Sequence, residues 1–260
     1  MDQANATARR ANDVCVVVLS CVMDEATVRM LWDEGQAAEA IAGARAALVG
    51  APEDARLSVA GALIACADAA DSSPMAEEAH RVAAELRESV WGSDHPRSPY
   101  VRLPLAGWLQ RVGRFDEAER ELLAALAVAE RRTEDPRPLR DVLVCLARLA
   151  LERNDLDEAA VRFQCAMAAE ESRPRPEAIE LQPLLGELHA IYAQQGRVAE
   201  AASAMERRLQ LSRTLGRRPS LDDARDLLAL ADLRDKQGRS GDAAALRERS
   251  ARISRAAGRR

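Results

Sequence analysis

Residues 113–118 read Gly-Arg-Phe-Asp-Glu-Ala, and this stretch decides the fold because it recurs along the chain. Successive copies start 39, 39, 41, 42 and 42 residues apart, and the first two copies are the weakest. A period of this length is typical of proteins built from repeated supersecondary units. The copies begin at Gly35, Pro74, Gly113, Asn154, Gly196 and Gly238.

Each copy has the chemistry of a turn between two helices. A glycine or asparagine suits the left-handed conformation that ends a helix. The acidic residues that follow favour the positive end of the next helix dipole. An alanine comes directly after them and is small enough for two antiparallel helices to cross closely. Two sets of alanines are therefore expected at helix crossings: Ala118, Ala159, Ala201 and Ala243, and, seven residues before the turns, Ala67, Ala106, Ala147 and Ala231.

Composition and prolines agree with a helical array. Aromatic residues make up only 3% of the chain, whereas strong helix formers dominate. Most of the prolines fall between one hairpin and the next, where proline breaks helices: Pro52, Pro96, Pro136, Pro138, Pro174, Pro176 and Pro219. We expect an all-α, right-handed superhelical solenoid of about six antiparallel helix pairs at residues 22–256. Residues 1–21 are expected to be a leading helix or a flexible N-terminus, and residues 257–260 a basic C-terminal end.

This pattern resembles the tetratricopeptide repeat. The spacing and the connector Gly92-Ser93-Asp94-His95-Pro96 are similar to the long version found in kinesin light chains, and similar arrays occur in bacterial signalling proteins. The resemblance implies the fold but not the way in which that version holds peptides. Its paired asparagines on the first helix are absent, and so is the Lys/Asn carboxylate clamp of repeats that bind chaperone tails. The matching places hold Leu103-Pro104, Val144-Cys145, Gly186-Glu187 and Leu228-Ala229.

No arrangement of residues indicates catalysis. The three histidines lack ligand spacing, and no nucleophile motif or phosphate-binding glycine loop occurs. We therefore expect no enzyme, no cofactor and no metal. The cysteines are odd in number and lack CxxC spacing, so each is expected to be a small buried apolar residue in a reducing compartment. They are Cys15, Cys21, Cys66, Cys145 and Cys165.

The N-terminus bears on the location of the protein. Arginines precede the apolar run 14–19, which ends in Leu19-Ser20-Cys21 and faintly resembles a lipoprotein signal. Asp13 interrupts the place where the apolar segment of a signal begins. A cytoplasmic location without a membrane anchor is therefore favoured over a lipid-anchored periplasmic factor. Lys236 is the only lysine among 37 basic residues, which indicates a GC-rich, bacterial gene.

The charge balance argues against nucleic acid as a partner. There are 42 acidic residues and a net charge of −5, whereas phosphate-binding surfaces need a basic excess. An arginine-rich tail follows Asp242, with Glu248 as its one acid. It is interpreted as a solvated final helix, or otherwise as a patch for RNA or an acidic partner. Its arginines are Arg247, Arg249, Arg252, Arg255, Arg259 and Arg260.

First helices of such arrays line the concave groove, and their inward positions are the candidate binding residues. His189 is unusual because it takes the place of a crossing alanine, so it either packs or contacts a partner. The groove is expected to be aromatic and positive early and acidic late, near Asp232 and Asp235, which suits an acidic peptide with an apolar anchor. The candidate partner-binding residues are Arg29, Trp32, Tyr100, Leu103, Arg111, Arg148, Glu152, His189 and Gln194.

These features favour a non-catalytic scaffold or adaptor that binds a segment of a partner protein in this groove. The alternative is a regulatory sensor, whose array responds to a peptide or small effector and controls a kinase, transcription factor or other effector. The sequence leaves the oligomeric state open.

Overall fold

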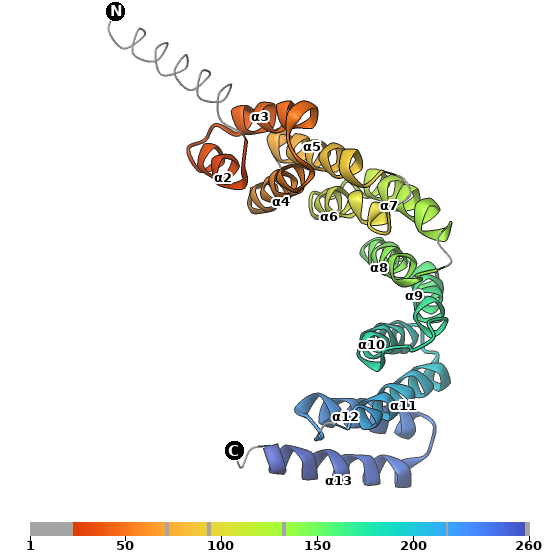
Figure 1. Cartoon of the computed structure of the whole chain (residues 1–260). Helices are drawn as coiled ribbons and strands as arrows, with labels where there is room; N and C mark the ends of the chain where they lie inside the picture. Colours follow the sequence, from red (N-terminus) through yellow and green to blue (C-terminus); the bar gives the residue numbers. More distant parts are fainter. Residues whose placement is uncertain (1–22, 71–72, 93–94, 132–133, 217, 258–260) are drawn as a thin grey trace, which may run out of the picture. The chain divides into compact units, whose positions relative to one another are not determined.

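The computed structural model describes residues 23–70, 73–92, 95–131, 134–216 and 218–257. These residues form twelve α-helices and one short 3-10 helix, with no strand among them (Figure 1). The expected leading segment 1–21, with Cys15 and Cys21, lies outside the described residues. Of the expected basic end, only Ala257 is described. The chain divides into two compact units, Met1–Arg131 and Arg132–Arg260.

The first unit contains three helix pairs. A first helix and a second helix alternate along the chain, and first helices contact first helices, as in α2 with α4, while α3 contacts α5. The helices are α2 (Glu25–Asp33), α3 (Ala37–Gly50), α4 (Glu53–Ala69), α5 (Pro74–Trp91), η1 (Ser98–Val101), α6 (Leu103–Arg111) and α7 (Phe115–Glu130).

The second unit contains three longer pairs. Each second helix also contacts the first helix of the following pair, as α9 does with α10 and α11 with α12. The helices are α8 (Arg137–Glu152), α9 (Leu156–Glu171), α10 (Ala178–Gln194), α11 (Val198–Thr214), α12 (Leu221–Lys236) and α13 (Ser240–Ala257). The predicted six helix pairs are therefore confirmed.

Five of the six predicted turns use a left-handed residue to end the first helix. Gly113 has φ 77°, and the next N–H, of Arg114, donates to the Leu109 carbonyl at 2.9 Å. Asn154 adopts φ 59° as the one non-glycine residue of this kind in the described chain. The turn before Pro74 differs, because α4 ends at Ala69 and the Ser73 side chain caps α5.

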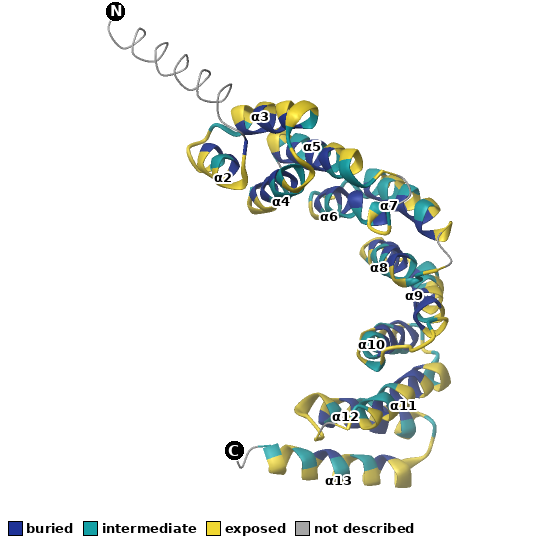
Figure 2. Ribbon diagram, in the orientation of Figure 1, coloured by how far each residue is buried: buried dark blue, intermediate teal, exposed yellow. Residues whose placement is uncertain are grey.

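The crossing alanines form the centre of the core. The faces that the helices turn toward one another are buried, as Figure 2 shows in dark blue. Large side chains such as Leu122 and Phe163 fill the space beside the alanines and are themselves fully buried. Both predicted alanine sets are confirmed, with 0% exposure at Ala118, Ala159, Ala201, Ala243, Ala67, Ala106, Ala147 and Ala231.

A buried ion-pair cluster fixes the connection from α9 to α10. The Glu170 side chain is fully buried and accepts hydrogen bonds from Arg140 at 2.7 Å and Arg173 at 2.6 Å. The backbone N–H of Glu177 donates to it at 2.8 Å. Burial would raise the pKa of Glu170, but these three donors together lower it. The cluster ties three consecutive helices of the second unit through one carboxylate.

Candidate functional site

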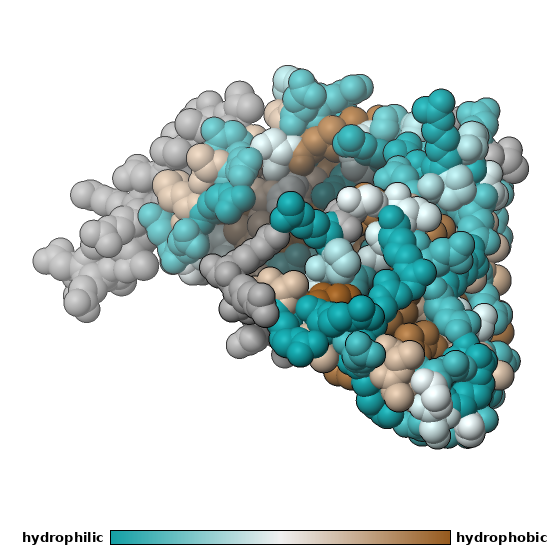
Figure 3. Space-filling model, turned by 90° about the horizontal axis from the view of Figure 1, so that it is seen from below, coloured by the Kyte–Doolittle hydropathy of each residue, from teal (hydrophilic) through white to brown (hydrophobic). Residues whose placement is uncertain are grey.

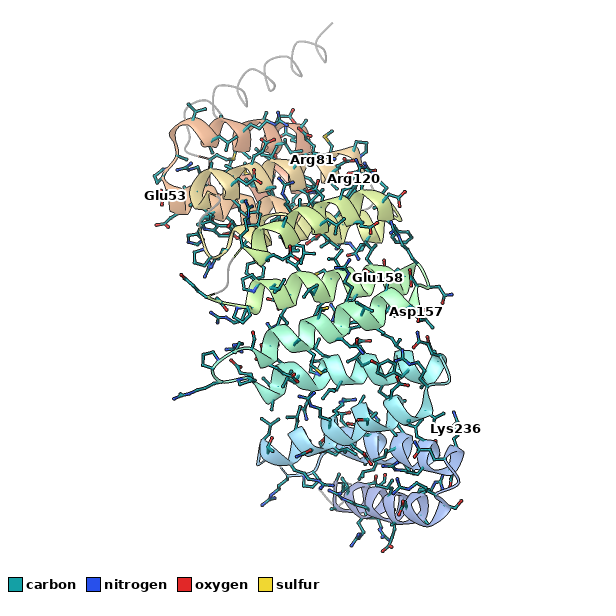
Figure 4. All side chains as sticks on the ribbon, turned by 90° about the vertical axis from the view of Figure 1, so that its right-hand side faces the viewer. Glu53, Arg81, Arg120, Asp157, Glu158 and Lys236 are labelled. Carbon is teal, nitrogen blue, oxygen red and sulfur yellow. The ribbon has the colours of Figure 1, made fainter. Side chains whose placement is uncertain are left out.

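In both units the candidate binding residues lie on first helices, except that Tyr100 of the first unit lies on η1. In the first unit they form the N-terminal first-helix face: Arg29, Trp32, Tyr100, Leu103 and Arg111. In the second unit they form the C-terminal first-helix face: Arg148, Glu152, His189 and Gln194. Figure 4 labels residues on both kinds of helix: Glu53 and Lys236 lie on first helices, and Arg81, Arg120, Asp157 and Glu158 on second helices.

Intrachain ion pairs occupy the cations of the N-terminal first-helix face. Arg29 pairs with Glu25 of its own helix at 2.8 Å, and Arg111 on α6 pairs with Asp68 on α4. Trp32 and Leu103 are half-buried. This face therefore offers apolar surface, while its positive charges are already compensated.

A buried histidine lies beneath the ion pair of Arg111 and Asp68. His80 on α5 is 1% exposed, and its Nε2 lies 3.4 Å from Asp68 Oδ1. Its ring centroid is 6.0 Å from that of Trp108, which is also buried. Burial lowers the pKa of His80, although Asp68 opposes this effect. The side chains of His80, Asp68 and Arg111 therefore join α5, α4 and α6 of the first unit.

Sequence reasoning missed this buried histidine, although a signal existed. His80 directly follows the repeat alanine Ala79, and the corresponding residues Ala160 and Ala202 are also buried. The corresponding Ile41 is buried as well, whereas Glu119 is half-buried and Ala244 is exposed, so the repeat position favours burial without fixing it.

Three of the four side chains on the C-terminal first-helix face have no hydrogen-bond or ion-pair partner in the described part of the chain. Arg148, Glu152 and Gln194 are exposed, and none has a hydrogen bond or ion pair with the described residues. The acids expected farther along behave differently, because Asp232 and Asp235 pair with Arg247 at 2.8 and 2.7 Å. These two carboxylates share one guanidinium, so the acidic charge expected late in the array is partly compensated within the chain.

His189 contacts the neighbouring helix. It is half-buried on α10, and its Nδ1 lies 3.2 Å from the carbonyl oxygen of Ala201 on α11, where the paired helices cross. At this crossing the ring nitrogen of His189 faces a backbone carbonyl oxygen, whereas most other repeats have an alanine methyl group at the corresponding position. This contact gives His189 a packing role.

A buried carboxylate lies near this histidine. Arg208 on α11 pairs with Asp226 on α12 at 3.0 Å, and the guanidinium lies over Gly186 on α10. A Cβ at position 186 would stand 3.2 Å from Arg208 Nη1. Burial raises the pKa of Asp226, although Arg208 opposes the shift. Because Gly186 has no side chain, Arg208 passes close over this position as it reaches α12, and an added Cβ would displace the guanidinium by a few tenths of an ångström.

The cysteines only partly follow the prediction. Cys66 is buried and Cys145 half-buried, and burial raises the pKa of both thiols. Cys165 is exposed, so the prediction of a buried residue is wrong there, because position 165 lies on the outer side of α9 next to the exposed Gln164.

In the described part of the chain, no cluster of histidine, cysteine and acidic residues is suited to a metal ion. Nor is any helix there long and apolar enough to cross a membrane.

Comparison with known proteins agrees with this architecture. Residues 184–219, which hold most of α10 and all of α11, match the tetratricopeptide repeat. No curated protein matches the sequence significantly. The structure is similar to BtubC (BKLC) from P. vanneervenii, with 18% identity, a TM-score of 0.67, and coverage of 86% of this chain and 90% of that one.

A second similar structure is a putative kinesin light chain of Podosopora anserina with nearly identical TPR-like repeats. Its TM-score is 0.57 at 18% identity, and the match covers 91% of this chain and 95% of that one. These likenesses concern the fold. The resemblance seen in the sequence is confirmed: the chain has the fold of tetratricopeptide-like repeats, including those of the kinesin-light-chain type, with a recognisable tetratricopeptide repeat at residues 184–219.

Proposed function

We propose that this chain is a non-catalytic scaffold or adaptor that holds a segment of a partner protein on its first-helix faces. Tetratricopeptide-like repeats generally serve as scaffolds for protein–protein interaction. The cytoplasm of a bacterium is the proposed location, in keeping with free thiols at Cys66, Cys145 and Cys165.

The observation that carries the proposal is the free state of Arg148, Glu152 and Gln194. Arg148 and Glu152 stand one helical turn apart on α8 with opposite charges, yet they make no ion pair. Exposed charges of this kind contribute little to stability even when paired. Oriented charges and an amide on two adjacent first helices instead favour the register and specificity of a bound segment.

The chemistry of the partner follows from the two faces. Trp32, Tyr100 and Leu103 supply half-buried apolar surface in the first unit, which suits an apolar anchor. In the second unit, Arg148 is the uncompensated cation of its face, so an acidic group of the partner is expected there. Arg29 and Arg111 are less suited to that role, because each already has an acidic partner.

Site-specific photo-crosslinking tests the assignment. A photoreactive amino acid at Gln194 reports on the C-terminal first-helix face, and the same amino acid at exposed Val161 of α9 reports on the second helices. We expect partner adducts from position 194 in extract of the source organism, and none from position 161. Equal crosslinking from both positions would show that the first-helix face is not the binding surface.

Charge reversal gives an independent test. Arg148→Glu is expected to weaken the 194 adduct at least about tenfold, since a repelled acidic group replaces an attracted one. Arg120→Glu, on the second helix α7, is the matched control, because Arg120 is also exposed and has only long contacts, at 3.9 Å with Glu117 and 3.4 Å with the Asp116 carbonyl oxygen. Circular dichroism of both variants establishes that the fold is retained.

A further inference from the structure

An open pocket lies beside α13, away from the candidate residues of the first-helix faces. It has a volume of about 700 Å³ and lies between the connector before α12 and the final turns of α13. Arg218 and Pro219 line it from the connector, and Arg249, Arg252, Ile253 and Ala256 line it from α13. Figure 3 looks at this end of the chain, where apolar side chains lie among hydrophilic ones. The volume is that of an ordinary small-ligand site.

The arginines of this pocket form no salt bridge with the part of the chain that the structure describes. Arg213 lines a small adjoining cavity together with Arg249, so four guanidinium groups gather here. None of Arg213, Arg218, Arg249 and Arg252 has a hydrogen bond or ion pair with the described residues. Desolvation lowers the pKa of Arg249, repulsion from Arg213 and Arg252 adds to this effect, and attraction to Asp223 opposes it without reversing it. The cations therefore repel one another in the free protein.

The nearby acids are engaged elsewhere. The Asp223 carboxylate accepts from the Ser212 hydroxyl and, at 2.6 Å, from the backbone N–H of Ser220. Asp222 pairs with Arg225 at 3.0 Å. Both carboxylates thus hold the start of α12. Asp223 also lines the small adjoining cavity and attracts Arg249, so it compensates that one arginine in part, without a salt bridge to it.

We propose that this pocket binds a phosphate monoester carried on an apolar group. A phosphate monoester has close to two negative charges near neutral pH and presents oxygens that match the planar fork of arginine. Ile253, Ala256 and Pro219 offer apolar surface beside the cations for the rest of the ligand. RNA fits less well, because no aromatic side chain for base stacking lies on α13.

Two sources supply this chemistry: a free small ester, or a phosphorylated aromatic side chain of a partner. Calorimetric titration of the full chain with phenyl phosphate tests the first source, and a phosphotyrosine peptide tests the second. Binding of either with one-to-one stoichiometry is expected. A peptide at least about tenfold tighter than phenyl phosphate assigns the site to a partner, and otherwise it belongs to a free ester. Absence of saturable binding by both probes overturns the proposal.

Variants locate the site. Arg249→Gln with Arg252→Gln is expected to reduce phenyl phosphate affinity at least about tenfold, since two charge-assisted contacts are lost. Arg255→Gln, on an exposed position of the same helix outside the pocket, is expected to leave affinity unchanged. Equal loss in both variants, or no loss in the double variant, overturns the assignment.

A second pair of variants covers the case that the double variant does not fold. Ala256→Glu places a carboxylate in the pocket and is expected to abolish binding, whereas Ala251→Glu, also exposed on α13, is not. Inorganic phosphate should bind at least about tenfold more weakly than phenyl phosphate, because it lacks the apolar group. Equal affinity for the two, or tighter binding of a single-stranded RNA, contradicts the proposal.

Discussion

His80 on α5 and Arg111 on α6 share the carboxylate of Asp68 on α4, with His80 Nε2 3.4 Å from Asp68 Oδ1. The histidine is buried and the arginine is exposed. The carboxylate between them therefore joins the core of the first unit to its surface.

The first unit is expected to lose stability in mild acid because of His80. Burial holds the pKa of His80 below the ordinary 6.5. Above that pH, the histidine is neutral in both the folded and the unfolded chain. As the pH falls through 6.5, the unfolded chain binds a proton that the folded chain does not. The free energy of unfolding should therefore decrease by up to about 1.4 kcal/mol per pH unit.

Urea denaturation followed by tryptophan fluorescence measures this effect. All three tryptophans, Trp32, Trp91 and Trp108, lie in the first unit, so the signal reports on that unit. The variant His80→Gln should show a flatter dependence between about pH 7.5 and about pH 5.5, where few carboxylates titrate. The same slope in the variant and the natural chain would show that His80 is not responsible.

The crossing of α8 and α9 should not tolerate a larger side chain at Ala159. This alanine has no exposed surface. Ala159→Leu is expected to lower the free energy of unfolding by about 1–3 kcal/mol through overpacking. Ala168→Leu, on the exposed side of the same helix, should change it by less than about 0.5 kcal/mol. Urea denaturation followed by far-ultraviolet circular dichroism compares them, and an unchanged midpoint for Ala159→Leu would contradict the prediction.

Removal of the buried charge at Glu170 should destabilise the second unit. Glu170→Gln leaves Arg140 and Arg173 with a neutral partner, which is expected to cost about 3 kcal/mol, the low end for breaking a buried pair. The cost stays low because Arg140 retains Asp141 and Glu180. The loss should be largest near neutral pH, since the lowered pKa of Glu170 means that its contribution disappears as the pH falls through that pKa.

Glu171 is a matched control for this substitution. It is the next residue on α9, and its pair with Arg207 is partly exposed to solvent. Glu171→Gln should cost no more than about 1 kcal/mol in the same denaturation experiment. Equal effects at positions 170 and 171 would show that burial of the charge is not what matters.

The turn at Asn154 tests whether a left-handed residue is needed to end the first helix of a repeat. An alanine there must adopt a conformation that costs an ordinary residue about 1–2 kcal/mol, and asparagine bears it more easily. Asn154→Ala is therefore expected to lower stability by about 1 kcal/mol. Asn154→Gly should stay within about 0.5 kcal/mol of the natural chain, because relief of strain is offset by greater freedom of the unfolded chain. A stabilising alanine would refute the role of the turn.

The sequence predicted the helix pairs because their causes are local and periodic. Gly113, Asn154 and Gly196 each mark a chain reversal by their own conformational preference, and Ala159 marks a crossing by its size. The prediction of binding residues was less complete because charge compensation is not local. Arg111 meets an aspartate 43 residues earlier, and Arg247 meets one 15 residues earlier. Such pairs depend on side-chain reach across helices, which the repeat period does not encode.

The contact of Arg208 with Asp226 across Gly186 bears on the use of this array as a set of building blocks. The pair joins the fifth repeat to the sixth, and its arginine lies against a glycine on a third helix. A chain shortened after α11 would lose the acid that neutralises Arg208, and the last pair transplanted alone would carry Asp226 without its cation. The repeats are therefore not interchangeable units. An exchange of one repeat has to preserve the ion pair between residues 208 and 226 and has to take account of the residue at position 186.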